Sequence, residues 1–258
     1  MRRRAAAAAR VGVAVSAILG PACAGAEDSS CPGHVSVAAA QASWYVVAAP
    51  ECSLPVTPSE FVTAVATPDY LGSQACGRCL RVAGPLGSVV VRVVDECLSC
   101  AQGDLDLGSD AFAQIGNPMD GVVPISYEST ECPVSGPVDV YMGLDTDASY
   151  AAIQLRNHLY PVASLEAYSG GAWLALSRRA DDYFALSPAG GVPAPLELRA
   201  TDVNGSVVSA SVPLPTAGTD VAAAGQFSPC PEPSRATGAA TGFAALVAAR
   251  RMRSRSRR

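Results

Sequence analysis

Two Cys-x2-Cys pairs, seventeen residues apart, form the clearest chemical pattern in the chain; they lie in the stretch ACGRCLRVAGPLGSVVVRVVDECLSC, residues 75–100. Four thiolates at this spacing can bind a zinc ion. Oxidised thiols at the same positions can instead form disulfides, which are typical of exported proteins. Zinc knuckles usually lie in tight turns, whereas an apolar run at 88–94 separates these pairs. The pattern therefore favours disulfides over zinc.

Carboxylates lie in the same region of the chain. Asp95 ends the apolar run, and Asp106 belongs to the sequence Asp-Leu-Asp-Leu at 104–107. Two carboxylates roughly 5–9.5 Å apart can cleave a glycosidic bond. The two histidines, His34 and His158, are far apart in the sequence, and the chain has no Gly-rich phosphate loop. We therefore expect no metal site and no cofactor.

Residues 1–26 have the composition of a secretory signal peptide. Three arginines follow Met1, the segment 5–19 is mostly apolar, and Ala24-Gly25-Ala26 is a small-x-small cleavage site. Lipid attachment at Cys23 is the alternative, although Gly20-Pro21-Ala22 is a poor match to that signal. We therefore expect the mature protein to be secreted.

The C-terminal end carries a candidate sorting signal. Pro-Glu-Pro-Ser at 231–234 precedes an apolar segment at 236–249 and a terminal arginine cluster. The apolar segment is shorter than the about 20 residues that a membrane span needs. The tail at 234–258 resembles the PEP-CTERM type of bacterial sorting signal, which implies attachment at the cell surface. A disordered basic tail is the alternative, and membrane contact is expected only through this tail.

The body between the two ends is acidic and rich in cysteine. Of the 18 basic residues, all arginine, seven lie between 27 and 232, together with all 23 acidic residues. The resulting charge, near −16, argues against nucleic acid and other polyanions as partners. Eight cysteines remain, an even number that predicts a disulfide framework whose pairing stays open. They are Cys31, Cys52, Cys76, Cys79, Cys97, Cys100, Cys132 and Cys230.

The elements that must position these residues fall into two blocks. Residues 31–133 hold seven of the eight cysteines, strand patterns at 79–82, 88–94 and 122–127, and a short helix at 109–115. Residues 137–214 hold no cysteine and six short alternating segments: 138–144, 150–156, 162–168, 172–176, 196–201 and 206–212. These blocks are typical of a compact β domain and a β-sandwich. Residues 215–233 are expected to be a loose linker.

Two motifs resemble the expansin family. The sequence VVDECLSCAQGDLDLGSDAFAQIGNPMDG at 93–121 is similar to the core of its double-psi β-barrel. The sequence YAAIQLRNHLYPV at 150–162 is similar to the opening of its carbohydrate-binding module, family 63. The resemblance runs from about Gly33 to Leu214. It implies a mainly β protein, with a six-stranded double-psi β-barrel at 31–133 followed by an immunoglobulin-like β-sandwich at 137–214.

The resemblance also implies a function and a set of site residues. Expansins are described as non-hydrolytic proteins that loosen cell walls, so we expect a monomer that binds insoluble polysaccharide, cellulose or a related β-glucan. By position, Asp106 is the main groove carboxylate, Asp95 a second groove acid, and Ser36 the groove hydroxyl. Tyr150 and Ser149 stand where the family has two platform tryptophans, and Tyr183 is the candidate for the third platform aromatic.

Cleavage is the main alternative to binding. Related family-45 glycoside hydrolases take their catalytic base from the N-terminal loop, but residues 34–50 contain no acid. Asp106 would then lack the second carboxylate that cleavage requires, unless Asp95 or Glu51 takes that role. An endoglucanase or a lytic transglycosylase acting on peptidoglycan therefore remains open, as does a surface adhesion module with a degenerate sugar site. Trp173 is expected to lie partly in the core, and Trp44-Tyr45 either line the groove or pack beneath it.

Overall fold

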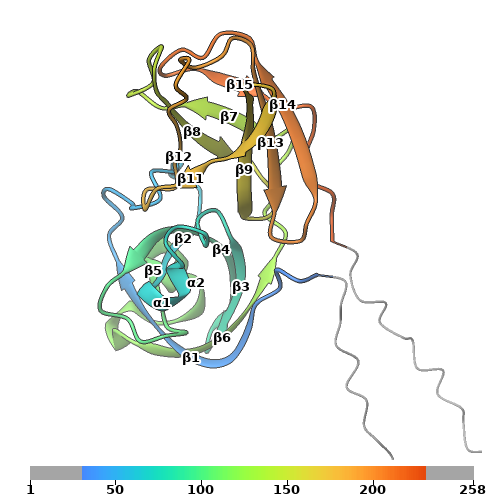
Figure 1. The fold of residues 1–258 in the computed structure, drawn as a ribbon. Helices are drawn as coiled ribbons and strands as arrows, with labels where there is room; N and C mark the ends of the chain where they lie inside the picture. The colour runs from blue at the N-terminus through green and yellow to red at the C-terminus, as the bar shows by residue number, and fades with distance from the viewer. Residues whose placement is uncertain (1–30, 231–258) are drawn as a thin grey trace, which may run out of the picture.

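The computed structural model describes residues 31–230, which form a barrel and a sandwich, one beside the other (Figure 1). The predicted signal peptide and sorting tail lie outside the described residues. The six barrel strands are β1 (Ser36–Tyr45), β2 (Val62–Ala66), β3 (Cys79–Gly84), β4 (Gly87–Cys97), β5 (Leu105–Gly108) and β6 (Val123–Thr130). They close in the order β1-β5-β2-β4-β3-β6, which confirms the predicted six-stranded β-barrel.

The barrel interior is filled by alternating apolar side chains and by one helix. Along β4, Val89, Val91 and Val93 point inward and are buried, as the two-residue period of a strand requires. The helix α2 (Ser109–Ile115) has the predicted bounds and buries Phe112 and Ile115 in the same core. Two shorter elements, α1 (Thr67–Tyr70) and η1 (Pro118–Asp120), lie in the connections.

The second part is the predicted β-sandwich. One sheet has the order β10-β9-β13-β14 and the other β11-β12-β8-β7-β15, and their inner faces share one apolar core. Six strands match predicted segments: β7 (Asp139–Met142), β8 (Ala151–Arg156), β9 (Val162–Ser169), β10 (Ala172–Ala175), β13 (Leu196–Asp202) and β14 (Val207–Val212). Three more, β11 (Ser177–Arg178), β12 (Phe184–Leu186) and β15 (Asp220–Ala222), are too short to show an alternating pattern.

The prediction of a loose linker at 215–233 is wrong for the described residues of that segment. Strand β15 pairs antiparallel with β7 and extends the five-stranded sheet. Phe227 is 1% exposed and belongs to the sandwich core, and Cys230 is disulfide-bonded. Composition suggested a spacer because Ala, Gly and Pro dominate the segment, but its few apolar side chains are enough to fix it.

All eight predicted cysteines form disulfides, and their pairing is now defined. The four bonds are Cys31–Cys230, Cys52–Cys76, Cys79–Cys132 and Cys97–Cys100. One Cys-x2-Cys pair closes on itself, whereas the two cysteines of the other pair take different partners. Across residues 31–230 no group of three or more His, Cys, Asp or Glu side chains could hold a metal ion. Because all four cysteines of the two Cys-x2-Cys pairs are used in disulfides, the zinc interpretation of their spacing is wrong.

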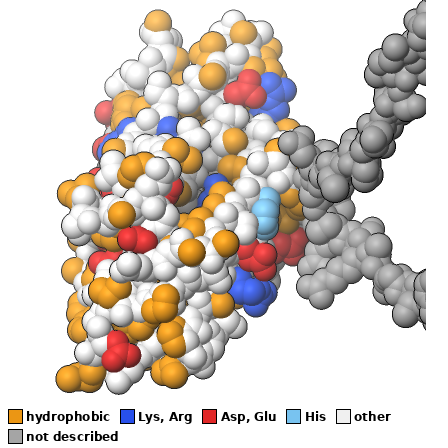
Figure 2. All heavy atoms as spheres, turned by 90° about the horizontal axis from the view of Figure 1, so that it is seen from below, with side chains coloured by type: hydrophobic (Ala, Val, Ile, Leu, Met, Phe, Trp, Pro, Cys, Tyr) orange, Lys and Arg blue, Asp and Glu red, His pale blue; other side chains and the backbone are white. Residues whose placement is uncertain are grey.

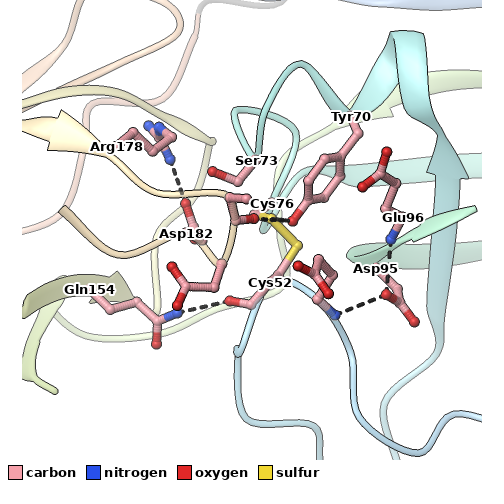
Figure 3. The surroundings of a disulfide bond; sticks show 12 residues. Cys52, Tyr70, Ser73, Cys76, Asp95, Glu96, Gln154, Arg178 and Asp182 are labelled. Carbon is pink, nitrogen blue, oxygen red and sulfur yellow. Dashed lines mark hydrogen bonds and ion pairs between the residues drawn. A yellow bond between two sulfur atoms is a disulfide. The ribbon is translucent and has the colours of Figure 1, made fainter. Parts of the chain in front are cut away.

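Buried hydrogen bonds join the barrel to the sandwich. Gln154 of β8 is fully buried, and its Nε2 donates to the carbonyl oxygen of Cys52 at 2.9 Å (Figure 3). The Tyr70 hydroxyl donates to the carbonyl oxygen of Ala180 at 2.7 Å. Elsewhere at the junction, the Cys31–Cys230 disulfide joins the N-terminal end of the barrel to the last part of the sandwich. The two parts are thus held together at more than one point.

The helices within the described residues are short. None of the helices within 31–230 is long and apolar enough to cross a bilayer.

Seen from below, acidic and basic side chains are scattered among hydrophobic and uncharged ones (Figure 2). That face shows no extended patch of one charge.

Candidate functional site

Asp106 lies on β5, between β1 and β2 of the barrel. Its carboxylate accepts a hydrogen bond from the Ser43 hydroxyl at 2.7 Å, because the parallel register of β1 and β5 places these two residues opposite each other. The Thr63 hydroxyl donates to its carbonyl oxygen at 3.0 Å. Asp106 is half-buried, so its backbone and one carboxylate oxygen are fixed while the side chain still reaches solvent.

Asp95 is brought to the same side of the barrel by β2. Ala64 of β2 lies opposite both Asp95 on β4 and Asp106 on β5. The Cα atoms of the two acids are therefore two strand spacings apart, about 9–10 Å. One oxygen of Asp95 accepts hydrogen bonds from the backbone N–H groups of Glu51 and Glu96, both at 2.9 Å (Figure 3). We call Ser43, Asp106, Ala64 and Asp95 the acid row.

Tyr45 completes the acid row from the end of β1. Its hydroxyl is buried close to the Asp95 carboxylate. Burial raises the pKa of this phenol well above its ordinary value, and the charges of nearby Asp95 and Asp106 raise it further. The phenol therefore stays protonated and, from its buried position, supports the Asp95 carboxylate of the acid row.

Ser36 is not part of the acid row, so its predicted place as the groove hydroxyl is wrong. It lies opposite Glu128 at the other end of β1, seven residues from Ser43 and thus roughly 20 Å away along the strand. Ser43 occupies the position beside Asp106 instead. The segment SVAAAQASWY contains several small residues in alternation, so the sequence did not define which serine faces the acid.

The two predicted platform tyrosines lie around one arginine. Arg179 donates to the Tyr150 hydroxyl at 3.1 Å and lies 5.5 Å from the ring centre of Tyr183. It also forms ion pairs with Asp145 at 2.9 Å and Asp181 at 2.6 Å. We call these five residues the Arg179 cluster. Both tyrosines are half-buried, so this surface is a mixed polar and aromatic one and not a bare aromatic platform.

The Arg179 cluster adjoins the acid-row side of the barrel. The carbonyl oxygen of Arg179 accepts from the Ser73 hydroxyl at 2.7 Å, one residue from the Tyr70–Ala180 bond. Burial raises the pKa of Tyr70, and the negative charges that add to this shift include those of Asp182 and Asp95. Figure 3 shows Tyr70 between Asp182 of the sandwich and Asp95 of the barrel. Groups from both domains therefore meet on one side of the junction.

The two tryptophans lie outside both clusters. Trp44 is exposed, and its indole N–H donates to the carbonyl oxygen of Pro118 at 3.3 Å, so it packs against η1. Trp173 is 39% exposed on β10, so the prediction that it lies partly in the core is wrong. Its two apolar neighbours suggested burial, but β10 is an edge strand with all four residues exposed.

The residues that the sequence interpretation missed are Ser43 and Arg179, whereas Tyr45 was predicted to line the groove or to pack beneath it. Ser43 and Tyr45 are two residues apart at the end of one strand, and this spacing places both on the same face. That alternation was the available signal. Arg179 had no comparable signal, because its partners come from segments up to 34 residues away.

The fold and the site define the class: a disulfide-bonded β-barrel with a surface row of hydroxyl and carboxylate groups, joined rigidly to a β-sandwich. Comparison with known proteins names the family. Expansin-YoaJ from Bacillus subtilis is 34% identical over 173 residues, covering 65% of this chain and 74% of that protein. The chain belongs to the expansin family.

Solved structures agree with this assignment. The apo structure of the Clavibacter michiganensis expansin has a TM-score of 0.69 and 30% identity, covering 76% of this chain and 99% of that one. An Asp-to-Asn variant of the same expansin, solved in complex with cellohexaose, has a TM-score of 0.70 and 29% identity over the same shares. A family model described as lytic transglycolase matches residues 37–127, within the barrel.

Proposed function

We propose that this protein binds neutral cell-wall polysaccharide, cellulose or a related β-glucan, along the acid row and the Arg179 cluster, and loosens contacts between polysaccharide chains without cleaving them. The observation that carries the proposal is Asp106, held by Ser43 and accompanied by the protonated phenol of Tyr45. Fixed carboxylate acceptors of this kind recognise sugar hydroxyls. The complex of a related expansin with cellohexaose supports the choice of ligand.

The hydrogen bonds of the two acids favour binding over hydrolysis. Cleavage needs one carboxyl group that donates a proton and another that activates water or attacks the sugar. One oxygen of Asp95 already accepts two backbone N–H groups, and one oxygen of Asp106 accepts from Ser43. Both acids are thus held as hydrogen-bond acceptors, and residues 34–50 supply no third acid.

The sandwich contributes in this proposal as a family-63 carbohydrate-binding module with a modified surface. Tyr150 is engaged by Arg179, so less aromatic area is free for the face of a sugar ring. Hydrogen bonding from Arg179 and its two carboxylates replaces part of that stacking. We therefore propose weaker binding to crystalline cellulose than to less ordered β-glucans.

A binding panel tests the function. Wild type and Asp106→Asn are incubated with insoluble cellulose, xylan and chitin, and the bound fraction and the reducing ends released are both measured. We expect binding without product release, and weaker binding for the variant. Equal binding by the two proteins would contradict the proposal. Gln114→Ala, on the exposed side of α2, serves as the matched control.

A lytic enzyme is the second candidate, because the model that matches the barrel carries that description. The spacing of about 9–10 Å between the Cα atoms of the two acids does not forbid a pair of catalytic carboxyl groups. Product release from peptidoglycan or soluble glucans that disappears in Asp106→Asn would establish cleavage and refute the non-lytic proposal.

We also propose that the protein is secreted as a monomer, with a barrel domain at 31–133 and a sandwich domain that extends from 137 to 230. The signal peptide at 1–26 and the sorting tail at 234–258 complete this proposal. N-terminal sequencing of the exported protein tests the cleavage of the signal peptide, and its intact mass shows whether the tail is retained. An unprocessed N-terminus would contradict the signal, and a protein found only in the medium would contradict surface attachment through the tail.

A further inference from the structure

The outer face of the sheet β10-β9-β13-β14 carries an ordered aromatic pair. Trp173 and Tyr168 lie opposite each other in the β9–β10 hairpin, with their ring centres 5.5 Å apart in an edge-to-face arrangement. They are 39% and 43% exposed. The inner face of the same strands is occupied by buried Leu165 and Ala167. The aromatic pair therefore lies on the solvent side of the sheet and does not serve the core.

Polar side chains surround the pair on the same face. The guanidinium of Arg199 lies 4.6 Å from the ring centre of Trp173 and forms an ion pair with Glu166 at 2.8 Å. Glu197 accepts a hydrogen bond from Ser211 at 2.6 Å on the neighbouring strand. The register places these residues across all four strands, a width of about 14 Å. We call Trp173, Tyr168, Arg199, Glu197 and Ser211 the Trp173 face.

The chemistry of the Trp173 face fits a neutral sugar chain. The faces of pyranose rings are lined with C–H groups that pack on aromatic rings, and carboxylates and hydroxyls bind the hydroxyls at the ring edges. Arg199 is neutralised by Glu166, so the face offers no excess positive charge to a polyanion. The acidic body, with 23 acidic residues against seven arginines, opposes polyanions further.

This surface points away from the proposed polysaccharide site. Tyr183 of the Arg179 cluster lies 6.4 Å from Tyr141, on the outer face of the other sheet, where Tyr141 alternates with buried Val140 and Met142. The Trp173 face is on the outer side of the opposite sheet. The two aromatic surfaces therefore lie on opposite sides of the sandwich, and one polysaccharide chain does not need to contact both.

We propose that the Trp173 face is a second polysaccharide-binding site, so that one molecule bridges two neutral glycan chains. The proposal rests on the polysaccharide-binding function given above and adds a second ligand position to it. Two linked sites on one rigid body raise the overall affinity for a multichain surface by making the second contact intramolecular. A protein that holds two chains in this way can also bring separate polysaccharide particles together.

Trp173→Ala tests the proposal, with Val207→Ala as a matched apolar control on the same sheet; Val207 is 54% exposed. Binding to insoluble cellulose and xylan is measured together with the sedimentation of dilute cellulose particles. Wild type and Val207→Ala should bind equally and aggregate the particles. Trp173→Ala should bind about two- to tenfold more weakly and fail to aggregate them. Trp173→Phe, which keeps an aromatic ring, should recover most of both effects.

Several outcomes would overturn the second site. Binding and particle aggregation by Trp173→Ala at the level of Val207→Ala, with weakened binding by Asp106→Asn, would remove the second site and leave the proposed function standing. No effect of either substitution, or no polysaccharide binding by wild type, would refute both. A concentration-dependent dimer of the wild type that Trp173→Ala dissociates would make this face a protein interface instead. Circular dichroism and thermal unfolding confirm that each variant is folded.

Discussion

The junction between barrel and sandwich can be tested at one side chain, Gln154. It is fully buried, donates to the carbonyl oxygen of Cys52 at 2.9 Å, and accepts from Arg156 Nε at 2.7 Å. The variant Gln154→Met keeps the approximate volume and removes both hydrogen bonds. The carbonyl of Cys52 would then lose its partner in a buried position, which costs about 1–3 kcal/mol. Arg156 keeps its contact with the Tyr141 ring and remains partly exposed to solvent. The loss of its hydrogen bond to Gln154 therefore adds little to this cost.

We therefore expect Gln154→Met to lower the free energy of unfolding by about 1–3 kcal/mol. Urea unfolding with the four disulfides intact measures this change. A shift of the midpoint with an unchanged slope would show that the stability changed and the extent of unfolding did not. Gln114→Ala is the control, because Gln114 is exposed and its hydrogen bond to Asp110 is long at 3.3 Å. A change below about 0.5 kcal/mol in Gln154→Met, equal to the control, would refute the argument that the junction depends on this bond.

Three further predictions concern the site and the stability of the fold. Asp106→Asn keeps an acceptor for Ser43 but loses the charge, so polysaccharide affinity should fall about tenfold or more in a pull-down assay, with unchanged thermal unfolding. Burial lowers the pKa of His158 to about 4, below its unfolded value near 6.5. The unfolded state therefore binds the proton more tightly than the folded state. The free energy of unfolding is highest above about pH 6.5 and decreases by up to about 3 kcal/mol as the pH falls towards 4. In urea unfolding, His158→Gln should show a smaller pH dependence over this interval. The double variant Cys31→Ser/Cys230→Ser removes a cross-link between residues 199 apart, and should lose about 5 kcal/mol in the chain-entropy account, measured by urea unfolding; a loss below about 1 kcal/mol would contradict it.

The parts of this fold that could be predicted are those with a local signal. Helix α2 has an apolar face and a glycine after its end, and β4 is a long alternating strand, so both follow from periodicity. The disulfide chemistry follows from an even cysteine count in a chain with a predicted signal peptide. The pairing does not, because Cys76 and Cys79 are neighbours that bond to residues 24 and 53 positions away in opposite directions.

Site residues that belong to a local sequence motif could be predicted, whereas those that are brought together by the pairing of several strands could not. Asp95 and Asp106 were identified through their motif, but their common neighbour Ala64 is defined only by the barrel closure. Ser36 was chosen over Ser43 because alternating small residues leave the register open. Phe227 and β15 were missed because a single buried aromatic and a three-residue strand give no periodicity.

The rigid junction explains how two dispersed sets of groups can serve one extended ligand. A polymer gains affinity from separate contacts only if the distance between them is fixed, since flexible contacts must be ordered at each binding event. Here the acid row is on the barrel and the Arg179 cluster on the sandwich. The Ser73 hydroxyl donates to the backbone carbonyl of Arg179, and the Tyr70 hydroxyl donates to that of the adjacent Ala180. These contacts are made to the backbone, so they hold the segment at 179–180 in place whichever side chains it carries. In the proposed function, the barrel therefore sets the position of the second contact surface, and substitutions at 150, 179 and 183 would change which polysaccharide is bound without moving that surface.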